Sequence, residues 1–212
     1  MVMLATALCG CSGNTENTPD NEKNPASTVR DGNDGDNKND GQVGGADILT
    51  DTYEIAATDP HYIISVPAWR AEGYGYGFAL NEKDNKDYAV VVACGYGAED
   101  KTLQEAFSVL YNDNFKGILM QNYRAKYAEF TPETKEVKLA DGSTALQFDG
   151  LQPADDYGTE MSCPIYGYGF SHEGVPFIVA YIVMKESSAD EAKRAEMQRY
   201  VDAMVNTVRT AQ

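Results

Sequence analysis

The sequence predicts an α+β domain with a mainly antiparallel sheet and helices on its faces. Apolar runs of strand length are joined by short turn signals such as Asp141-Gly142, which favour hairpins. Two capping boxes, Thr102-Leu-Gln-Glu105 and Ser188-Ala-Asp-Glu191, each precede apolar residues at helical spacing. The resulting order of strands, helix, strands and terminal helix fits a single domain over residues 48–212.

The first part of this domain contains four predicted strands. Tyr53–Ala57 and Tyr62–Val66 are β-prone runs on either side of an Asp59-Pro60 turn signal. Tyr74–Leu80 alternates aromatic residues with glycine, and Tyr88–Cys94 has the unbroken apolar character of a buried strand.

A helix is expected next, from Thr102 to about Gly117. Its apolar residues recur at helical spacing and would share one face: Leu103, Ala106, Phe107, Leu110 and Tyr111. The following stretch, Ile118–Phe130, is compatible with a continuation of this helix or with a strand.

The second part of the domain returns to strands. Val137–Leu139 and Thr144–Phe148 form a predicted hairpin around the Asp-Gly turn, and Gln152–Glu160 is polar and loop-like. Ser162–Phe170 and Val175–Met184 are two more strands; the second is the most apolar stretch of the domain and is expected in mid-sheet. The closing helix has one apolar stripe, which should pack across the sheet: Met197, Val201, Met204, Val205 and Val208.

Residues 12–47 have a different composition and form a predicted disordered linker. They contain almost no aliphatic or aromatic side chains, so they cannot bury enough apolar surface to offset the entropy of ordering. Three basic and eight acidic residues give this segment a net charge of −5. A flexible coil of this length reaches roughly 30–35 Å, which would hold the domain clear of a lipid surface.

The first eleven residues end in a short targeting motif. The apolar run Met1–Leu8 leads into Leu8-Cys9-Gly10-Cys11, which resembles a bacterial lipobox. The resemblance implies that the chain is cleaved before Cys11 and that Cys11 carries acyl chains, which would anchor the protein on the extracytoplasmic face of the bacterial cell membrane. The alternative is a soluble protein with an apolar N-terminus. Met1–Leu8 lacks the basic n-region of a signal peptide, so we expect the true signal sequence to begin upstream.

The pattern of the folded region resembles the PsbP-like α/β sandwich fold. The resemblance covers most of residues 50–210 and lies in the segment Ile63-Ile-Ser-Val-Pro-Ala-Trp69, the helix opened by Thr102-Leu-Gln-Glu105, the strand Gly142-Ser-Thr-Ala-Leu146, the paired late strands and the closing helix. Members of that family have diverse roles, so the resemblance implies a fold and no functional residue.

The net charge of −16 excludes some classes of partner. Non-specific nucleic-acid binding requires cationic side chains, and so does electrostatic docking on anionic lipids. We therefore expect no nucleic-acid partner, and membrane attachment only through the N-terminal lipid.

Motifs for catalysis, cofactors or metals are missing. The sequence has no Gly-x-Ser-x-Gly, phosphate-binding glycine loop or His-Glu-x-x-His. His61 and His172 border turns and lack further ligands at metal-site spacing. The acidic stretch Asp31–Asp36 fails the EF-hand pattern in either register. We expect neither cofactor nor metal.

Two cysteines of the domain, Cys94 and Cys163, lie in predicted strands. In an exported domain they are a candidate disulfide. The alternative is two small, buried apolar side chains.

An aromatic-glycine repeat supplies the candidate binding residues. Gly73-Tyr-Gly-Tyr-Gly-Phe78 recurs as Tyr166-Gly-Tyr-Gly-Phe170, and Cys94-Gly-Tyr-Gly97 is a shorter echo. In a strand the aromatic side chains of each copy would share one face, opposite the glycines. They are either core beneath a helix or a recognition surface formed by Trp69, Tyr74, Tyr76, Tyr166 and Tyr168.

Two functions of different class remain open from the sequence. The first is a tethered, non-catalytic module that binds an envelope protein, a peptide or a glycan. The alternative is an envelope hydrolase that uses carboxylates of the Asp149–Glu160 region, namely Asp149, Asp155, Asp156 and Glu160.

Overall fold

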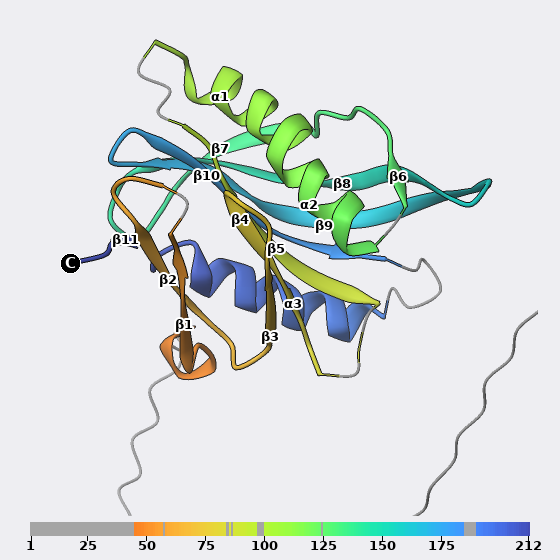
Figure 1. Ribbon diagram of the computed structural model, residues 1–212, viewed down its shortest axis with the longest axis horizontal. Coiled ribbons are helices and arrows are strands. Elements are labelled where there is room, and N and C mark those ends of the chain that lie inside the picture. The colour runs from red at the N-terminus through yellow and green to blue at the C-terminus, as the bar shows by residue number, and fades with distance from the viewer. Residues whose placement is uncertain are drawn as a thin grey trace, which may run out of the picture. The chain divides into compact units, whose positions relative to one another are not determined.

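The computed structural model describes residues 45–56, 58–83, 85, 87–96, 100–123, 125–184 and 190–212. All of them belong to one compact unit that spans residues 42–212. The lipobox and most of the expected linker lie outside the described residues. Within the unit, an antiparallel sheet lies between helices, which confirms the α+β class (Figure 1).

Among the described residues, the large sheet has eight strands, and all of their pairings are antiparallel. Its order is β3-β4-β5-β10-β9-β8-β6, with β7 also paired to β8. The strands are β3 Arg70–Gly73, β4 Gly77–Asn81, β5 Tyr88–Cys94, β6 Lys126–Tyr127, β7 Thr134–Lys138, β8 Thr144–Asp156, β9 Thr159–His172 and β10 Val175–Val183.

The two central strands are buried on both faces. β10 lies between β5 and β9, as its apolar sequence predicts. Alternation along β5 sends Val90 and Val92 to one face and Ala89 and Val91 to the other, and all four are fully buried. The sheet therefore separates two apolar cores.

One face of the sheet, here called the α1 face, is covered by a nearly continuous helical segment. It comprises α1 (Leu103–Leu110), the π-helical turn η2 (Tyr111–Phe115) and α2 (Lys116–Tyr123). The predicted capping box is present, because Thr102 Oγ1 accepts from Glu105 N at 3.2 Å and Glu105 Oε2 accepts from Thr102 N at 2.9 Å. The helical segment runs past the predicted end at Gly117, so the ambiguous stretch after it begins as helix.

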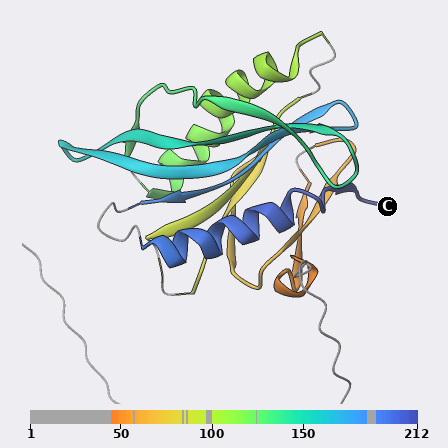
Figure 2. The ribbon, with the colours of Figure 1, turned by 180° about the vertical axis from the view of Figure 1, so that it is seen from behind.

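The opposite face, here called the α3 face, is covered by a helix and a small sheet. The helix is α3 (Glu191–Met204), and the sheet consists of β1 (Asp51–Ile55), β2 (Tyr62–Val66) and β11 (Arg209–Thr210) in the order β1-β2-β11. The 3₁₀ turn η1 (Gly45–Ile48) also contacts α3. Seen from behind, α3 and β1–β2 again lie across the large sheet from α1 and α2 (Figure 2). The predicted packing of the closing helix is confirmed by Met197, Val201 and Met204, which are buried in this core.

The second predicted capping box places the N-cap of α3 at Ser188, and this prediction is wrong. The cap is Asp190, whose Oδ1 accepts from Ala192 N at 2.8 Å, and Ser188 lies outside the described residues. A carboxylate satisfies the free N–H groups of a first turn as well as a hydroxyl does, so the sequence offered two compatible starts.

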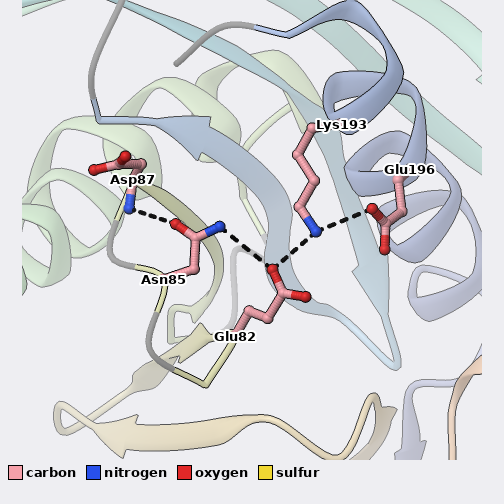
Figure 3. A network of polar contacts seen from close by, with 5 residues as sticks. All are labelled: Glu82, Asn85, Asp87, Lys193 and Glu196. Carbon is pink, nitrogen blue, oxygen red and sulfur yellow. Dashed lines mark hydrogen bonds and ion pairs between the residues drawn. The ribbon is translucent and has the colours of Figure 1, made fainter. Parts of the chain in front are cut away.

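Polar contacts join α3 to the turn between β4 and β5. Lys193 Nζ lies 2.8 Å from Glu82 Oε2 and 2.9 Å from Glu196 Oε2, and Asn85 Nδ2 donates to Glu82 Oε2 at 3.4 Å (Figure 3). Asn85 Oδ1 in turn accepts from Asp87 N at 3.0 Å. The predicted polar turn thus helps to hold α3 over the sheet.

Two strand predictions need correction. Gln152–Glu160 is a continuous hairpin of β8 and β9, because backbone pairing to β9 and β6 orders even exposed polar residues. Tyr74–Leu80 is a turn followed by β4, and Gly75 within it has a φ of +59°. Positive φ is a glycine conformation that ends an extended run.

Candidate functional site

The structure does not bring the five predicted aromatic binding residues together. Tyr166 and Tyr168 retain exposures of only 7% and 8% beneath α3. In the second copy of the repeat, the aromatic residues are therefore core beneath a helix, which is one of the two alternatives left open by the sequence. Opposite them, Gly169 lies against Phe107, whose Cδ2 would be 2.3 Å from an added Cβ. Gly169 therefore permits close packing of α1.

The hydroxyl groups of these two tyrosines belong to a partly buried polar cluster. Both are placed to donate to Asp202 Oδ1 on α3 at 2.8 Å, and both accept from Gln147 Nε2, at 2.8 and 3.0 Å. The two phenol oxygens are 2.7 Å apart. Burial raises the pKa of both tyrosines above the usual value, so both remain neutral at physiological pH. The cluster holds α3 to the sheet.

The first copy is divided between two faces. Tyr74 packs toward the α1 face and donates to Glu72 Oε2 at 2.8 Å; burial, followed by this hydrogen bond, raises the pKa of Tyr74 to about 12. Tyr76 and Phe78 pack toward the other core. Trp69 is half-buried and forms an edge contact with Tyr200 of α3, with ring centroids 4.7 Å apart.

The candidate disulfide does not form. Neither Cys94 nor Cys163 is disulfide-bonded, and they belong to the cores on opposite faces of the sheet. Burial raises the pKa of Cys94 to about 12, and its Sγ donates to the carbonyl oxygen of Tyr76 at 3.2 Å. Both cysteines act as small buried side chains, the alternative in the sequence analysis.

The carboxylates of the hydrolase alternative lie on the β8–β9 hairpin. Asp149, Asp156 and Glu160 are exposed, and Asp155 Oδ1 accepts from Gly158 N in the turn at 2.8 Å. His61 Nδ1 lies 2.7 Å from Glu54 Oε1 on the surface, and His172 makes an edge contact with Tyr62. Within the described ranges, no three His, Cys, Asp or Glu side chains are grouped to hold a metal ion.

An apolar cavity lies elsewhere, between α1 and the end of β5, and is called the Tyr96 pocket below. Its volume is about 330 Å³, near the lower end of the range of about 300–1,000 Å³ for ligand sites. It is lined by Gly95, Tyr96, Lys101, Ala106, Val109, Leu110, Asp113, Asn114 and Pro176.

Two large apolar side chains at this pocket are open to solvent. Tyr96 is 73% exposed and Val109 is 46% exposed. The Tyr96 ring packs edge-on against Tyr76, with centroids 4.8 Å apart. One predicted binding residue, Tyr76, therefore stands directly behind the exposed tyrosine.

Local backbone features hold the pocket in place. Asp113 and Asn114 belong to the π-helical turn η2, a type of turn that is frequent at functional sites. Asn114 Nδ2 donates to the carbonyl oxygen of Cys94 at 2.7 Å, and Gly95 N donates to that of Pro176 at 3.0 Å. The floor of the pocket is thus fixed to the central strands, while Tyr96 remains at its rim.

Sequence reasoning singled out the Cys94-Gly-Tyr-Gly97 echo but did not include Tyr96 among the binding residues. The echo itself was one available signal. The other was Val109, an apolar residue outside the buried stripe of α1, which is typical of an exposed position. Val109 and Tyr96 line the same pocket only because of the way α1 packs on the sheet, and the spacing of residues in the sequence does not show that packing.

Comparisons with known proteins concern the fold alone. No protein-family model and no curated protein matches the sequence. A structure from Bacteroides thetaiotaomicron VPI-5482 has 12% identity and a TM-score of 0.42, over 77% of this chain and 49% of that chain, so this chain spans about half its length. Cyanobacterial PsbP (CyanoP) from Synechocystis sp. PCC 6803 has 15% identity and a TM-score of 0.44, over 81% and 98%.

The Ran-binding protein Mog1p of Saccharomyces cerevisiae has 12% identity and a TM-score of 0.39, over 70% of this chain and 89% of that chain. A PsbP structure is thus among the similar chains. Of the helices that the structure describes, none has the length and apolar character needed to cross a membrane.

Proposed function

We propose that this chain is a membrane-tethered extracytoplasmic lipoprotein whose folded domain is a non-catalytic binding module. The observation that carries the proposal is Tyr96, which is 73% exposed at the rim of an apolar pocket. Tyrosines with a flat apolar body and a polar end are enriched at protein interfaces. The pocket would receive an apolar side chain from a segment of an envelope protein.

The size and lining of the Tyr96 pocket suit one anchoring side chain. Leu110, Val109 and Pro176 supply an apolar wall, and about 330 Å³ accommodates an aliphatic or aromatic group. Interfaces gain most of their affinity from a few such anchors in desolvated pockets. Tyr96 would close over the anchor and exclude water from it.

The net charge of the folded region indicates which charge the partner should carry. Fourteen basic and twenty-five acidic residues after position 47 give the folded region a net charge of −11. Exposed Asp113 is one of the residues that line the pocket, and Lys101 is another. We expect the anchoring residue to be flanked by Lys or Arg, because complementary charge raises association rates and disfavours acidic competitors.

The tether is proposed from the sequence Leu8-Cys9-Gly10-Cys11 and from the polar, acidic composition of residues 12–47. A lipid on Cys11 together with a flexible coil would let the module search the space near the membrane. Mass spectrometry of membrane-extracted protein should show an N-terminal, acylated Cys11. An uncleaved and unmodified Cys11 would refute the lipoprotein assignment.

Photo-crosslinking in intact cells tests the pocket. A photoreactive residue at Val109 should give a discrete adduct with another protein, and Tyr96→Ser should reduce it strongly. The matched control carries the photoreactive residue in place of Met120, which is 43% exposed on α2 and is not among the residues that line the pocket. Identical adducts from both positions, or no effect of Tyr96→Ser, would count against the pocket as the binding site.

A further inference from the structure

The β8–β9 hairpin ends in a two-residue turn with an unusual first residue. Tyr157 has a φ of 52° and Gly158 a φ of 89°. Turns of this kind favour Asn, Asp or Gly at the first position, because most L side chains are strained at positive φ. Tyr157 is also 86% exposed. The chain therefore keeps a large aromatic side chain at a strained position where it packs little against its own domain.

The turn at the other end of β9 provides a comparison. Glu173 and Gly174 have the same pattern, with φ values of 50° and 81°. The Glu173 carboxylate accepts from Thr210 Oγ1 at 2.5 Å, so an internal contact accounts for that side chain. For Tyr157, no described residue supplies a side-chain hydrogen bond or ring contact. Strain of this kind is often associated with a functional site.

The tip is held firmly, and its surroundings are acidic. Gly158 N donates to Asp155 Oδ1 at 2.8 Å, and the ladder pairs Asp155 with Glu160 and with Lys126 of β6. Beside the tip, an open hollow of about 710 Å³ is lined by Lys126, Tyr127, Ala128, Pro153, Ala154, Asp155, Glu160, Met161 and Ser162. A projecting aromatic side chain thus adjoins a concave surface.

We propose that the tip of the β8–β9 hairpin is a second protein-docking surface, in which Tyr157 inserts into a cleft of a partner with a basic rim. Tyrosine loses little conformational entropy on binding and is a frequent hot-spot residue. Asp155, Asp156 and Glu160 would meet the basic rim and orient the approach. The surface lies at the opposite end of β9 from the Tyr96 pocket. Experiments can therefore contradict one of the two proposed binding sites without contradicting the other.

Thermal unfolding of the full chain gives the first test. Tyr157→Asn creates the favoured Asn-Gly turn and should raise Tm by about 2–4 °C, the shift expected for roughly 1 kcal/mol in a chain of this size. Glu173→Asn is the matched control in the same type of turn, and it should gain less because the bond to Thr210 is lost. A fall in Tm for Tyr157→Asn would mean that the ring packs on its own domain, and it would overturn the proposal.

Crosslinking in intact cells gives the second test. A benzophenone-bearing phenylalanine analogue at position 157 should yield an adduct whose partner peptide is rich in Lys or Arg, and the same analogue at 173 should not. The variant Asp155→Asn/Asp156→Asn/Glu160→Gln should reduce the adduct several-fold. No adduct at 157, equal adducts at both positions, an adduct with a second copy of this chain, or one insensitive to the charge variant would each overturn the proposal.

Discussion

The sequence Tyr-Gly-Tyr-Gly-Phe occurs twice in this chain and adopts two structures. In residues 166–170 it is part of β9, and all three rings lie in the core on the α3 face. In residues 74–78, Tyr74 packs toward the α1 face and Phe78 toward the α3 face, with a turn between β3 and β4. The alternation of aromatics and glycines does not by itself determine a strand.

The difference follows from the neighbouring strands. Residues 166–170 are paired with β8 on one side and with β10 on the other, so the ladder imposes strict alternation. In the first copy the ladder to β5 begins only at Gly77, and Gly75 adopts a φ of +59°. Gly75 thus provides a left-handed backbone in the first copy, whereas Gly167 and Gly169 allow close packing in the second.

Truncating the rings should show the largest contrast between the copies. Tyr168→Ala removes a buried ring and a hydrogen bond to Asp202, so we expect it to lower the free energy of unfolding by about 3–5 kcal/mol. Tyr76→Ala should cost less than half of that, since Tyr76 is only half-buried. Urea denaturation of both variants measures the difference. Equal losses would show that the two copies contribute alike.

Adding a methyl group to one glycine of each copy should give a smaller contrast in stability. A Cβ at Gly167 would lie 2.5 Å from the carbonyl oxygen of Val179 and 2.4 Å from Ala180 Cβ, so Gly167→Ala should destabilise the protein by about 3 kcal/mol. Gly75→Ala meets nothing within 4 Å and should cost only about 1 kcal/mol, through its positive φ.

The double variant Gly167→Ala/Ala180→Gly provides a control for this explanation. It removes the Cβ clash but leaves the backbone oxygen of Val179 in place, so denaturation should show partial recovery. Full recovery, or a Gly75→Ala variant as unstable as Gly167→Ala, would contradict the assigned roles of the two glycines.

The smallest effect concerns the ion pair that links the two regions. Lys193 of α3, the helix over the second copy, pairs with Glu82, which follows β4 of the first. Burial opposes the charged form of Lys193, but its hydrogen bonds to Glu82 and Glu196 outweigh this and raise its pKa. A raised pKa means that the pair stabilises the fold below the unfolded-state lysine pKa of about 10.4 and loses this effect as pH rises through the higher folded value.

Lys193→Met should therefore lower stability by about 0.2–1 kcal/mol at pH 8. The gap to the parent protein should narrow as pH rises above about 10.4. Urea midpoints of both proteins, measured over this range, provide the readout. A gap that stays constant or widens with pH would show that the packing of the Lys193 side chain, and not its charge, is what matters.

Much of the fold was predictable because the deciding signals are local. β10 was expected in mid-sheet from its unbroken apolar run, and Thr102 caps α1 as its capping box predicts. The hairpin at Asp141-Gly142 is present, and Gly142 has a φ of +85°. Each of these features depends on residues within a few positions of one another.

The failures depend on tertiary pairing. The polar composition of Gln152–Glu160 predicts a loop, yet contacts with β6 and β9 hold it as two strands. The Tyr96 pocket combines the end of β5, the start of β10 and two turns of helix. Tyr76 was predicted, but Val109 and Tyr96 become neighbours of one cavity only through the docking of α1.

The entry of the chain into the domain also has a mechanical consequence. The described residues begin at η1, which contacts α3 and leads into β1, a strand paired only with β2 at the edge of the small sheet. A pulling force from the N-terminal side would act first on the contact between η1 and α3, and then on β1. The large sheet, to which the Tyr96 pocket is fixed, would bear the load only after η1 and β1 had detached. The small sheet would then unfold under tension before the large sheet does, so the pocket would keep its shape.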